Sequence, residues 1–439
     1  MTSKSQIDFI SDPAGPIKGT IQVPGDKSIT HRGIILGAIS EGKSIVRHYL
    51  DSEDIKATIA VFNEMGVKID RTDDAIEIHG VGLNGLTPPE KPLDFGNSGT
   101  SVRLMTGLLT GQSFNSELLG DDSLMKRPMG RIVDPLRMMG ADVQCDERGT
   151  LPIRVTGGKK LIGINYQTPV ASAQLKSCLL LAGLYAEGKT SITEPMATRD
   201  HTERMLGSFG SNITKTDLTV NITAGKLLGS NINVPGDISS ASFFIIAACL
   251  SPGSDLLLKN VGINPTRNAV IEILTRMGAD ISVRQDSNND AEPVADIRVR
   301  YQPLTGIEIP VELIPNAIDE FPAILVAAAS AQGDTVLTGA EELRQKESDR
   351  IEAIADGLSR LGIEALTSND GIRVTGGTLL GGEISSYGDH RIAMAFTIAG
   401  IAAKDSVKIQ DCVNVNTSFP GFVDVCRSVG MNVVEQVNG

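Results

Sequence analysis

The sequence predicts an α/β protein built from six similar units, most economically arranged as two domains of three units each. Three observations lead to this fold class. At 439 residues the chain exceeds the size at which one hydrophobic core usually stops growing. Six stretches repeat one order of helix-like and strand-like segments. Apolar residues make up 41% of the chain with 4% aromatic and no Trp, so small aliphatic side chains must fill the interior, which suits helices packed tightly against sheets.

Each of the six stretches opens on small or polar residues, continues as an apolar run with helical spacing, breaks, and ends in a strand-like run. The first reads "GDKSITHRGIILGAISEGKSIVRHY", in which a glycine marks the break. In chain order the stretches span residues 25–49, 96–119, 171–192, 236–258, 318–337 and 388–409.

A second helix-like segment follows in each unit, ends at a glycine and leads into another strand; "IKATIAVFNEMGVKI" is an example. Glycine is expected there because the residue just past a helix often has a left-handed backbone, which glycine adopts at little cost. The closing glycines recur at intervals of about 68 to 84 residues, at Gly66, Gly140, Gly210, Gly278, Gly362 and Gly430.

Two stretches, "GAISEGKS" at 37–44 and "GLYAEGKT" at 183–190, have the spelling of a nucleotide-binding P-loop. A P-loop needs a strand before its glycines and a helix after them, whereas both stretches follow a helix-like run and precede a strand-like one. We therefore predict that the second glycine of each ends a helix and that the next lysine lies against the helix dipole, which concerns Gly42 with Lys43 and Gly188 with Lys189.

Charge and cysteine usage exclude several classes of protein. The formal net charge of −13, with no long basic run, argues against nucleic-acid partners. No uninterrupted apolar run approaches the length of a membrane span, and the N-terminus lacks the apolar region of a signal peptide. The five scattered cysteines indicate a reducing compartment, and the histidines lack metal-ligand spacing. We expect a cytoplasmic protein that binds neither metal nor membrane.

The starts of the helix-like runs and the loops beside them carry the unusual polar residues. Helix N-termini attract anions, and Arg forks bind carboxylates or phosphates at two points. An acidic protein with basic residues at these positions is typical of a site for small anionic substrates, in which Asp319 and Glu347 are candidates for proton transfer. Taken singly, each residue could equally be a helix cap or part of a surface ion pair, and only the recurrence favours function. The residues are Lys27, Ser28, Arg32, Asn97, Gly99, Arg103, Arg127, Ser172, Gln174, Arg199, Asp319, Lys346, Glu347, Arg350 and Arg391.

At these positions the sequence resembles the 5-enolpyruvylshikimate-3-phosphate synthase family of enolpyruvyl transferases, over nearly the whole chain. The motifs that carry the resemblance are "PGDKSITHR", "GNSGTSVRL", "ASAQLKS", "TRDHTERML", "VPGDISSASFF", "IDEFP", "ELRQKESDRI", "YGDHRIAMA" and "TSFPGF". It implies two similar domains, each of three βαβαββ units in a pseudo-threefold inside-out α/β barrel, with the active site in the cleft between them. The N-terminal domain would span 24–236, and residues 1–23 would join 237–439 in the C-terminal domain.

The resemblance also implies the reaction and its residues. The enolpyruvyl group of phosphoenolpyruvate passes to the 5-hydroxyl of shikimate 3-phosphate, on the pathway to chorismate and the aromatic amino acids, without metal, nucleotide or other cofactor, and we expect a monomer. The resemblance implies that Asp319 is the base that accepts the hydroxyl proton. It implies that Glu347 and Lys27 carry protons to and from the methylene carbon. The residues similar to the shikimate 3-phosphate contacts are Lys27, Ser28, Arg32, Ser172, Gln174, Arg199, Asp319 and Lys346; those similar to the phosphoenolpyruvate contacts are Lys27, Gly99, Arg127, Gln174, Arg350 and Arg391.

Two stretches depart from the family pattern. No Lys precedes the "TSFP" motif, where some members have one, and "ASAQ" stands where others have adjacent serines. The family is the target of the herbicide glyphosate, which occupies the phosphoenolpyruvate site. The resemblance implies that Gly99 leaves room for it there, so we expect glyphosate to inhibit this protein.

Three alternative functions fit the sequence less well. The nearest is the related enzyme that acts on UDP-N-acetylglucosamine, but that family has a reactive Cys where this chain reads "LGDDSLMKRPMG". A P-loop nucleotide-binding protein is disfavoured by the order of helix and strand. A non-catalytic repeat scaffold would not explain the acids and bases at the helix starts.

Overall fold

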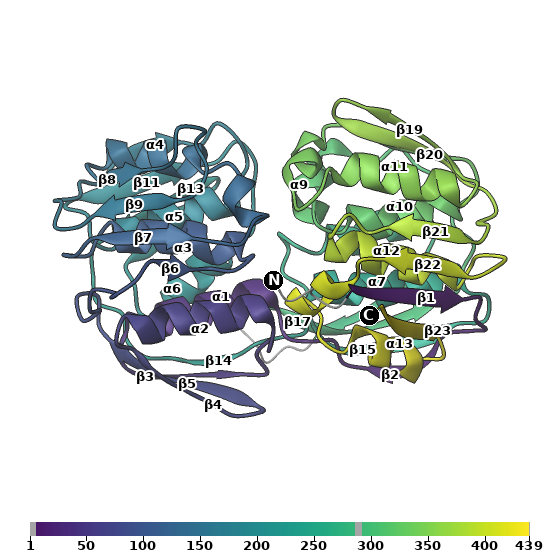
Figure 1. The fold of residues 1–439 in the computed structure, drawn as a ribbon, viewed down its shortest axis with the longest axis horizontal. Helices are drawn as coiled ribbons and strands as arrows, with labels where there is room; N and C mark the ends of the chain where they lie inside the picture. The colour runs from purple at the N-terminus through teal and green to yellow at the C-terminus, as the bar shows by residue number, and fades with distance from the viewer. Residues whose placement is uncertain (1–5, 286–291, 439) are drawn as a thin grey trace. The chain divides into compact units, whose positions relative to one another are not determined.

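The structure, a computed structural model, describes residues 6–285 and 292–438. By its internal contacts the chain divides into two compact units (Figure 1). The N-terminal unit comprises residues 25–234, and the C-terminal unit comprises 1–24 and 235–439, of which 1–5, 286–291 and 439 lie outside the described residues. From the sequence we expect an N-terminal domain at residues 24–236. The N-terminal unit of the structure comprises residues 25–234.

The N-terminal unit alternates helices and short strands. Its helices are α1 (Lys27–Ala38), α2 (Glu53–Glu64), α3 (Gly99–Leu109), η1 (Leu124–Lys126), α4 (Gly130–Met138), α5 (Ala173–Gly183) and α6 (His201–Ser208). Its strands are β3 (Glu41–Arg47), β4 (Lys68–Arg71), β5 (Ala75–Val81), β6 (Leu93–Asp94), β7 (Ser116–Leu119), β8 (Asp142–Gln144), β9 (Ile153–Thr156), β10 (Asn165–Gln167), β11 (Lys189–Thr193), β12 (Ile213–Thr216), β13 (Thr219–Thr223) and β14 (Asn231–Asn233).

The C-terminal unit repeats this alternation and includes the start of the chain. Its helices are α7 (Ile238–Leu250), α8 (Ala269–Arg276), η2 (Val311–Leu313), α9 (Ile314–Ala317), α10 (Phe321–Ala329), η3 (Glu341–Gln345), α11 (Arg350–Arg360), α12 (His390–Gly400), η4 (Val413–Thr417) and α13 (Phe422–Ser428). Its strands are β1 (Gln6–Asp12), β2 (Lys18–Ile21), β15 (Asp255–Gly262), β16 (Asp280–Gln285), β17 (Val294–Arg300), β18 (Asp334–Leu337), β19 (Glu364–Ser368), β20 (Gly371–Thr375), β21 (Gly382–Ser385), β22 (Val407–Gln410) and β23 (Asn432–Asn438).

One sheet pattern occurs six times among the described residues, three times in each unit. The four-stranded sheets are β14-β3-β5-β4, β6-β7-β9-β8, β10-β11-β13-β12, β2-β15-β17-β16 and β21-β22-β1-β23. In each, the first two strands named are parallel and the other neighbours are antiparallel. In the sixth, β18-β20-β19, an isolated parallel bridge between Glu308 and Val336 takes the place of the parallel strand. The six units inferred from the sequence are therefore confirmed.

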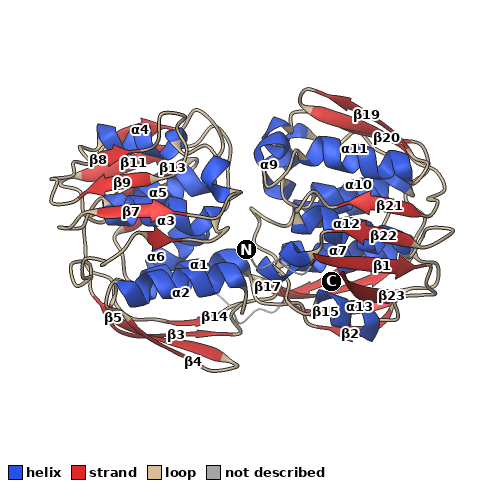
Figure 2. Cartoon of the chain, in the orientation of Figure 1, coloured by secondary structure: helices blue, strands red, loops and turns tan. Residues whose placement is uncertain are grey.

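The first helix of each repeat lies at the centre of its unit, with the sheets outside (Figure 2). In the N-terminal unit α3 contacts both α1 and α5, and in the C-terminal unit α7, α10 and α12 contact one another. Every residue of α7 and of α10 is buried. Burial of apolar side chains on every side stabilises these helices. The positions of their N-termini are therefore well fixed. The longest described helix has 13 residues, and none is long and apolar enough to cross a membrane.

The second helices end as predicted. All six closing glycines lie just past the C-cap of α2, α4, α6, α8, α11 or α13 and have positive φ, between 80° and 97°. At the end of α2 the Gly66 amide donates to the Asn63 carbonyl at 3.1 Å, and the Val67 amide donates to the Phe62 carbonyl at 3.0 Å. This is the Schellman pattern, in which a left-handed residue satisfies the last carbonyls of a helix.

The two P-loop look-alikes are confirmed to follow a helix and to lead into a strand, but the predicted caps are wrong. Helix α1 ends at Ala38, and Gly42 lies inside β3 opposite Gly80, with a φ of 91°. Lys43 is also a strand residue and forms an ion pair with Glu77. Gly188, with a φ of 87°, comes directly before β11, which begins at Lys189. Both glycines serve the turn that enters a strand.

Candidate active site

In the N-terminal unit, α1 begins at a charged residue. Lys27 is its first residue, and Asp26 caps the helix by accepting a hydrogen bond from the Ile29 amide at 2.8 Å. Lys27 Nζ lies 2.5 Å from Asp54 Oδ2. The carboxylate is nearly buried, whereas the lysine side chain is 23% exposed. Asp54 thus anchors an ammonium group that still reaches solvent.

Arg32 lies one turn along α1, and its guanidinium is buried. Nε donates to Thr202 Oγ1 at 2.6 Å, Nη2 donates to Ser177 Oγ at 3.0 Å, and Nη1 donates to the Ser28 carbonyl at 3.0 Å. These neutral acceptors orient the guanidinium between α1, α5 and α6 without cancelling its charge. Arg199 lies half-buried in the loop that leads into α6.

Arg127 and Gly99 come together at the start of α3. Gly99 is the first residue of that helix, and Arg127 Nη2 donates to Asn97 Oδ1 at 2.6 Å in the turn before it. A Cβ atom added to Gly99 would lie 3.0 Å from Nη1 of both Arg127 and Arg103. The absence of a side chain at Gly99 therefore lets two guanidinium groups approach the helix N-terminus.

The start of α5 lies beside this arginine pair. Arg103 Nη1 donates to Gln174 Oε1 at 2.8 Å, and Gln174 Nε2 donates to Thr100 Oγ1 at 3.2 Å, so both ends of the glutamine side chain are fixed. Ser172 is the N-cap of α5, where its hydroxyl accepts a hydrogen bond from the Leu175 amide at 3.4 Å. The N-terminal unit thus gathers Gly99, Arg103, Arg127 and Gln174 at adjoining helix starts.

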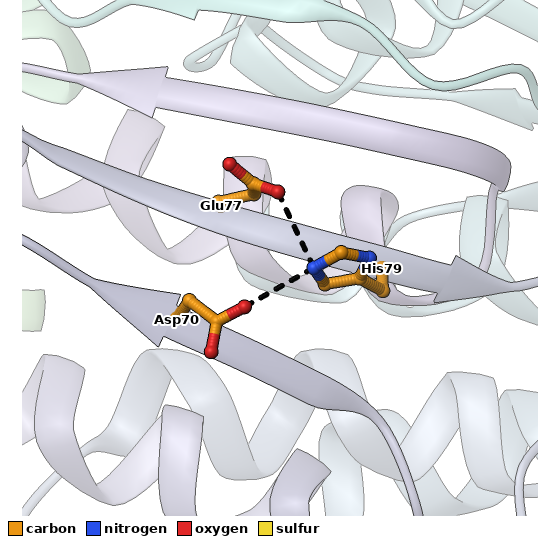
Figure 3. A group of neighbouring side chains, drawn as sticks. All are labelled: Asp70, Glu77 and His79. Carbon is orange, nitrogen blue, oxygen red and sulfur yellow. Dashed lines mark hydrogen bonds and ion pairs between the residues drawn. The ribbon is translucent and has the colours of Figure 1, made fainter.

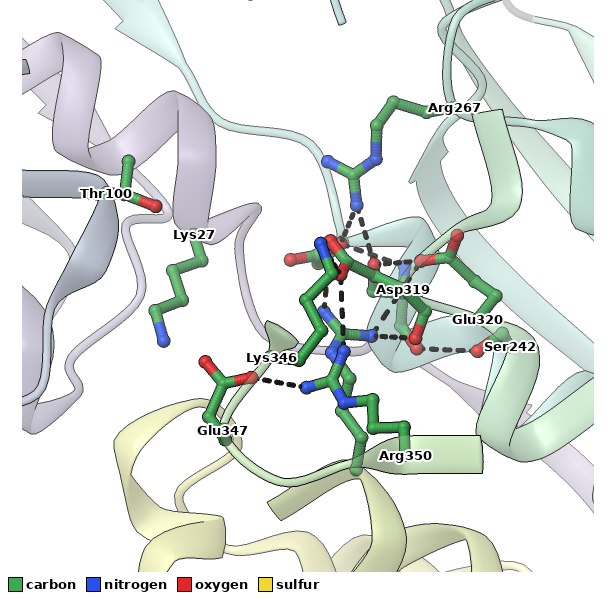
Figure 4. A network of polar contacts seen from close by, with 12 residues as sticks. Lys27, Thr100, Ser242, Arg267, Asp319, Glu320, Lys346, Glu347 and Arg350 are labelled. Carbon is green, nitrogen blue, oxygen red and sulfur yellow. Dashed lines mark hydrogen bonds and ion pairs between the residues drawn. The ribbon is translucent and has the colours of Figure 1, made fainter. Parts of the chain in front are cut away.

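In the C-terminal unit, three cations lie within 4.0 Å of Asp319, and Figure 4 labels two of them, Lys346 and Arg350. Asp319 Oδ1 lies 3.6 Å from Lys346 Nζ and 3.4 Å from Arg350 Nη1, and Oδ2 lies 4.0 Å from Arg391 Nη2. Arg391 also donates to the Asp319 carbonyl at 2.8 Å. Lys346 Nζ also forms an ion pair with Glu342 Oε1, at 2.8 Å. Asp319 therefore lies among opposite charges at distances where they attract it.

Arg350 holds Glu347 and is itself held by a buried acid. Its Nη2 donates to Glu347 Oε2 at 2.7 Å, and its Nε donates to Asp389 Oδ2 at 2.8 Å. Burial would lower the pKa of Arg350, but the carboxylates of Asp389, Glu347 and Asp319 raise it above its ordinary value. Burial would likewise raise the pKa of Asp389, but the Arg350 guanidinium holds it below its ordinary value. Both groups of this pair are therefore charged in the folded protein.

Comparison with known protein families decides between the alternatives. Residues 11–426 match the family described as EPSP synthase (3-phosphoshikimate 1-carboxyvinyltransferase). The chain belongs to the EPSP synthase family. The 3-phosphoshikimate 1-carboxyvinyltransferase of Methylococcus capsulatus is 56% identical over 97% of this chain and 98% of that protein. The one of Legionella pneumophila strain Philadelphia 1 is 55% identical over 98% of this chain and 99% of that protein.

Solved structures of the EPSP synthase family agree with the fold. EPSP synthase of Acinetobacter baumannii, at 2.37 Å, superposes with a TM-score of 0.88 at 48% identity, covering 98% of this chain and 100% of that one. A second structure of the Acinetobacter baumannii enzyme gives a TM-score of 0.87. The predicted fold class, two similar domains of the inside-out α/β type, is confirmed.

Four residues hold members of this candidate site, and of these only Arg103 was among the candidates that the sequence indicated. Asp54 anchors Lys27, Arg103 orients Gln174, and Asp389 anchors Arg350. Glu320, which directly follows Asp319, is fully buried beside Arg391. The signal available in the sequence was position, because Asp389 and Glu320 are the N-caps of α12 and α10 and lie next to assigned residues.

A second group of charged side chains lies on the exposed face of the sheet that contains β4 and β5 (Figure 3). His79 Nε2 is 3.1 Å from Asp70 Oδ2 and 3.3 Å from Glu77 Oε1. The three side chains are of types that bind metals, but each carboxylate already has an ammonium partner, Lys68 at 2.9 Å from Asp70 and Lys43 beside Glu77. Hydrogen bonding to Lys68 lowers the pKa of Asp70. Ion pairs within β4 and β5 and between neighbouring strands therefore account for this group.

The residues that would support the related UDP-N-acetylglucosamine enzyme are absent from the corresponding loop. Residues 119–130 include η1 and deliver Arg127, and they contain no Cys. Elsewhere, burial raises the pKa of Cys178 and of Cys249 to about 12, which disfavours their nucleophilic thiolate form at neutral pH.

Proposed function

We propose that this protein transfers the enolpyruvyl group of phosphoenolpyruvate to the 5-hydroxyl of shikimate 3-phosphate, giving 5-enolpyruvylshikimate 3-phosphate and phosphate. Membership of the EPSP synthase family over residues 11–426 carries the proposal. The cations at helix starts support it, because the substrates together bring two phosphates and two carboxylates. The test is release of inorganic phosphate from the two substrates without metal or ATP. A protein that needs ATP, or that releases no phosphate, would contradict the proposal.

The proposed chemistry is addition followed by elimination. A proton is added to the methylene carbon of phosphoenolpyruvate, which leaves C2 electron-poor. The 5-hydroxyl oxygen then bonds to C2 while Asp319 accepts the hydroxyl proton. In the second step the C2–O bond to phosphate breaks, a proton leaves the new methyl group, and the carbon–carbon double bond forms again. Lys27 and Glu347 are the proposed carriers of the methyl proton, and either could perform either transfer.

The binding residues are proposed in two groups that act on one pair of substrates. Lys27, Ser28, Arg32, Ser172, Gln174, Arg199, Asp319 and Lys346 are assigned to shikimate 3-phosphate. Lys27, Gly99, Arg127, Gln174, Arg350 and Arg391 are assigned to phosphoenolpyruvate. The orienting hydrogen bonds on Arg32, Arg127 and Gln174 support these roles, since prepositioned donors lose little entropy on binding.

We also propose that the protein works as a monomer in the cytoplasm and without a cofactor. Size-exclusion chromatography tests whether it is a monomer.

Arg127→Ala is expected to raise KM for phosphoenolpyruvate by about tenfold or more, with a much smaller change in kcat, because a charge-assisted contact to the substrate is lost. Steady-state phosphate release at varied phosphoenolpyruvate measures this. Arg148→Ala, which removes an arginine side chain that is 87% exposed, is the control. Equal KM values for wild type and Arg127→Ala would remove Arg127 from the proposed site.

Gly99→Ala is expected to raise KM for phosphoenolpyruvate several-fold and to weaken inhibition by glyphosate. The new Cβ would lie 3.0 Å from the guanidinium groups of Arg103 and Arg127, so both must move away from the helix start. The matched control is Gly130→Ala, at the first residue of α4, where a Cβ meets nothing within 4 Å. Wild-type activity that persists in millimolar glyphosate would contradict the expected inhibition. An unchanged KM for phosphoenolpyruvate in Gly99→Ala would show that the added Cβ does not displace Arg103 and Arg127.

A further inference from the structure

Glu320 is a buried acid next to the proposed base, and the chemistry described above does not use it. Its side chain is fully buried, although an isolated carboxylate is among the most expensive groups to bury. Among the described residues Oε2 has no hydrogen-bond partner, so the surroundings only partly compensate the charge. A buried polar atom left in this state calls for a specific explanation.

Oε1 of Glu320 lies between a hydroxyl and a guanidinium. Ser239 Oγ donates a hydrogen bond to it, and Arg391 Nη1 lies 3.8 Å from it. The same Arg391 nitrogen donates to the Asp319 carbonyl at 2.8 Å. Glu320 is also the N-cap of α10, and its carbonyl accepts the Ile324 amide at 3.0 Å, which fixes the main chain directly after Asp319.

Arg267 sets the direction of this hydrogen-bond chain. Its buried Nη2 donates to Ser239 Oγ at 2.6 Å and to Asp237 Oδ1 at 3.0 Å. Because Arg267 is only a donor, the Ser239 hydroxyl must accept from it and has its single proton left for Glu320. Asp237 caps α7 by accepting the Ser239 amide at 2.9 Å, so the serine is fixed through its main chain as well. Glu320 is thereby held as a hydrogen-bond acceptor 3.8 Å from Arg391 Nη1. Figure 4 shows Glu320 and Arg267 in this network.

We propose that Glu320, oriented by Ser239 and Arg267, is a positioning residue that holds the Arg391 guanidinium in the geometry that receives phosphoenolpyruvate. Arginine has a long side chain with many rotamers, and binding an anion in two-point fashion requires its plane to be fixed beforehand. The Asp319 carbonyl fixes one nitrogen, and the Glu320 carboxylate supplies the attraction that keeps the group beside α10. This inference rests on the proposed function, because it assigns Arg391 to phosphoenolpyruvate.

The decisive variant is Glu320→Gln, which keeps the acceptor for Ser239 and removes the charge that faces Arg391. We expect KM for phosphoenolpyruvate to rise by about tenfold, and KM for shikimate 3-phosphate to stay within about twofold. Ser239→Ala is expected to raise KM for phosphoenolpyruvate as well, by a smaller factor. A purely structural defect would lower the fraction of active enzyme, and so kcat, without separating the two KM values. Thermal melting of each variant shows whether it is folded.

Ser242→Ala is the matched control. Ser242 lies one turn along α7 and is fully buried, and its hydroxyl donates to the Ser239 carbonyl at 2.7 Å rather than to the Glu320 carboxylate. Both KM values should match wild type in this variant. If wild type shows no turnover, the proposed function fails and this inference fails with it. If wild type is active and neither Glu320→Gln nor Ser239→Ala raises KM for phosphoenolpyruvate above that of Ser242→Ala, the inference alone is overturned.

Discussion

Asp319→Ala is expected to lower kcat by a factor of about 10² to 10⁴, the usual range for the loss of a general base, and to leave both KM values nearly unchanged. The carboxylate lies within 4.0 Å of Lys346, Arg350 and Arg391. Its removal leaves these cations with less negative charge nearby, which favours rather than hinders the binding of anionic substrates. A fall in kcat that far exceeds any change in KM therefore indicates that accepting a proton is the main role of Asp319, beyond its proposed contact with shikimate 3-phosphate.

The measurement is steady-state phosphate release with each substrate varied in turn. Asp356→Ala is the control, since Asp356 lies on α11 and pairs with Arg360 at 2.8 Å, so its loss removes an ion-paired carboxylate outside the proposed site. Asp319→Asn keeps the shape and the hydrogen-bonding oxygen, and it should lose activity to a similar degree if proton acceptance is the role. Full activity in Asp319→Ala would show that another group accepts the hydroxyl proton.

The sequence predicted the repeated architecture because local rules govern it. The order of helix and strand follows from hydrophobic periodicity, and the six glycines past the second helices follow from the backbone that a helix end requires. The same rule failed at Gly42 and Gly188. A left-handed residue is also needed where a chain turns into a strand, so a glycine between a helix and a strand does not reveal which element it serves.

The binding residues could be predicted in part because they recur at helix starts, but their supporting residues could not. Asp389 meets Arg350 from 39 positions away, and Ser239 meets Glu320 across 81. Such pairs arise where helices that are far apart in the sequence pack together, and no local pattern encodes them. Single residues such as Asp389 look like ordinary helix caps, which Asp389 also is, because it accepts the Arg391 amide at 2.8 Å. Asp389 both caps α12 and anchors Arg350. Because capping is the commoner role of an Asp at a helix start, the sequence alone does not reveal the ion pair.

Arg350→Met is expected to destabilise the folded state by about 3–5 kcal/mol, the cost of leaving a buried partner charge uncompensated. Asp389 is that partner, completely buried and 2.8 Å from Arg350 Nε. The chain has no Trp, so urea unfolding followed by circular dichroism is the suitable measurement. Arg350→Met with Asp389→Leu should recover much of the lost stability, because an apolar pair of similar size avoids the uncompensated charge. A double variant no more stable than Arg350→Met would contradict this account.

The pH dependence gives an independent check on the same pair. In wild type the pKa of Asp389 is lower folded than unfolded, so its stabilisation is present above about pH 4 and is lost as pH falls through the folded value. Arg350→Met removes the largest cause that lowers the pKa of Asp389, so burial raises the folded pKa, the ionised acid opposes folding at neutral pH, and protonation relieves this cost. The stability difference between the two proteins should therefore be largest near pH 7 and shrink as pH falls from the raised folded pKa of Asp389 in the variant to its lowered folded pKa in wild type. A difference independent of pH would mean that lost packing around the Arg350 side chain, rather than the charge on Asp389, causes the destabilisation.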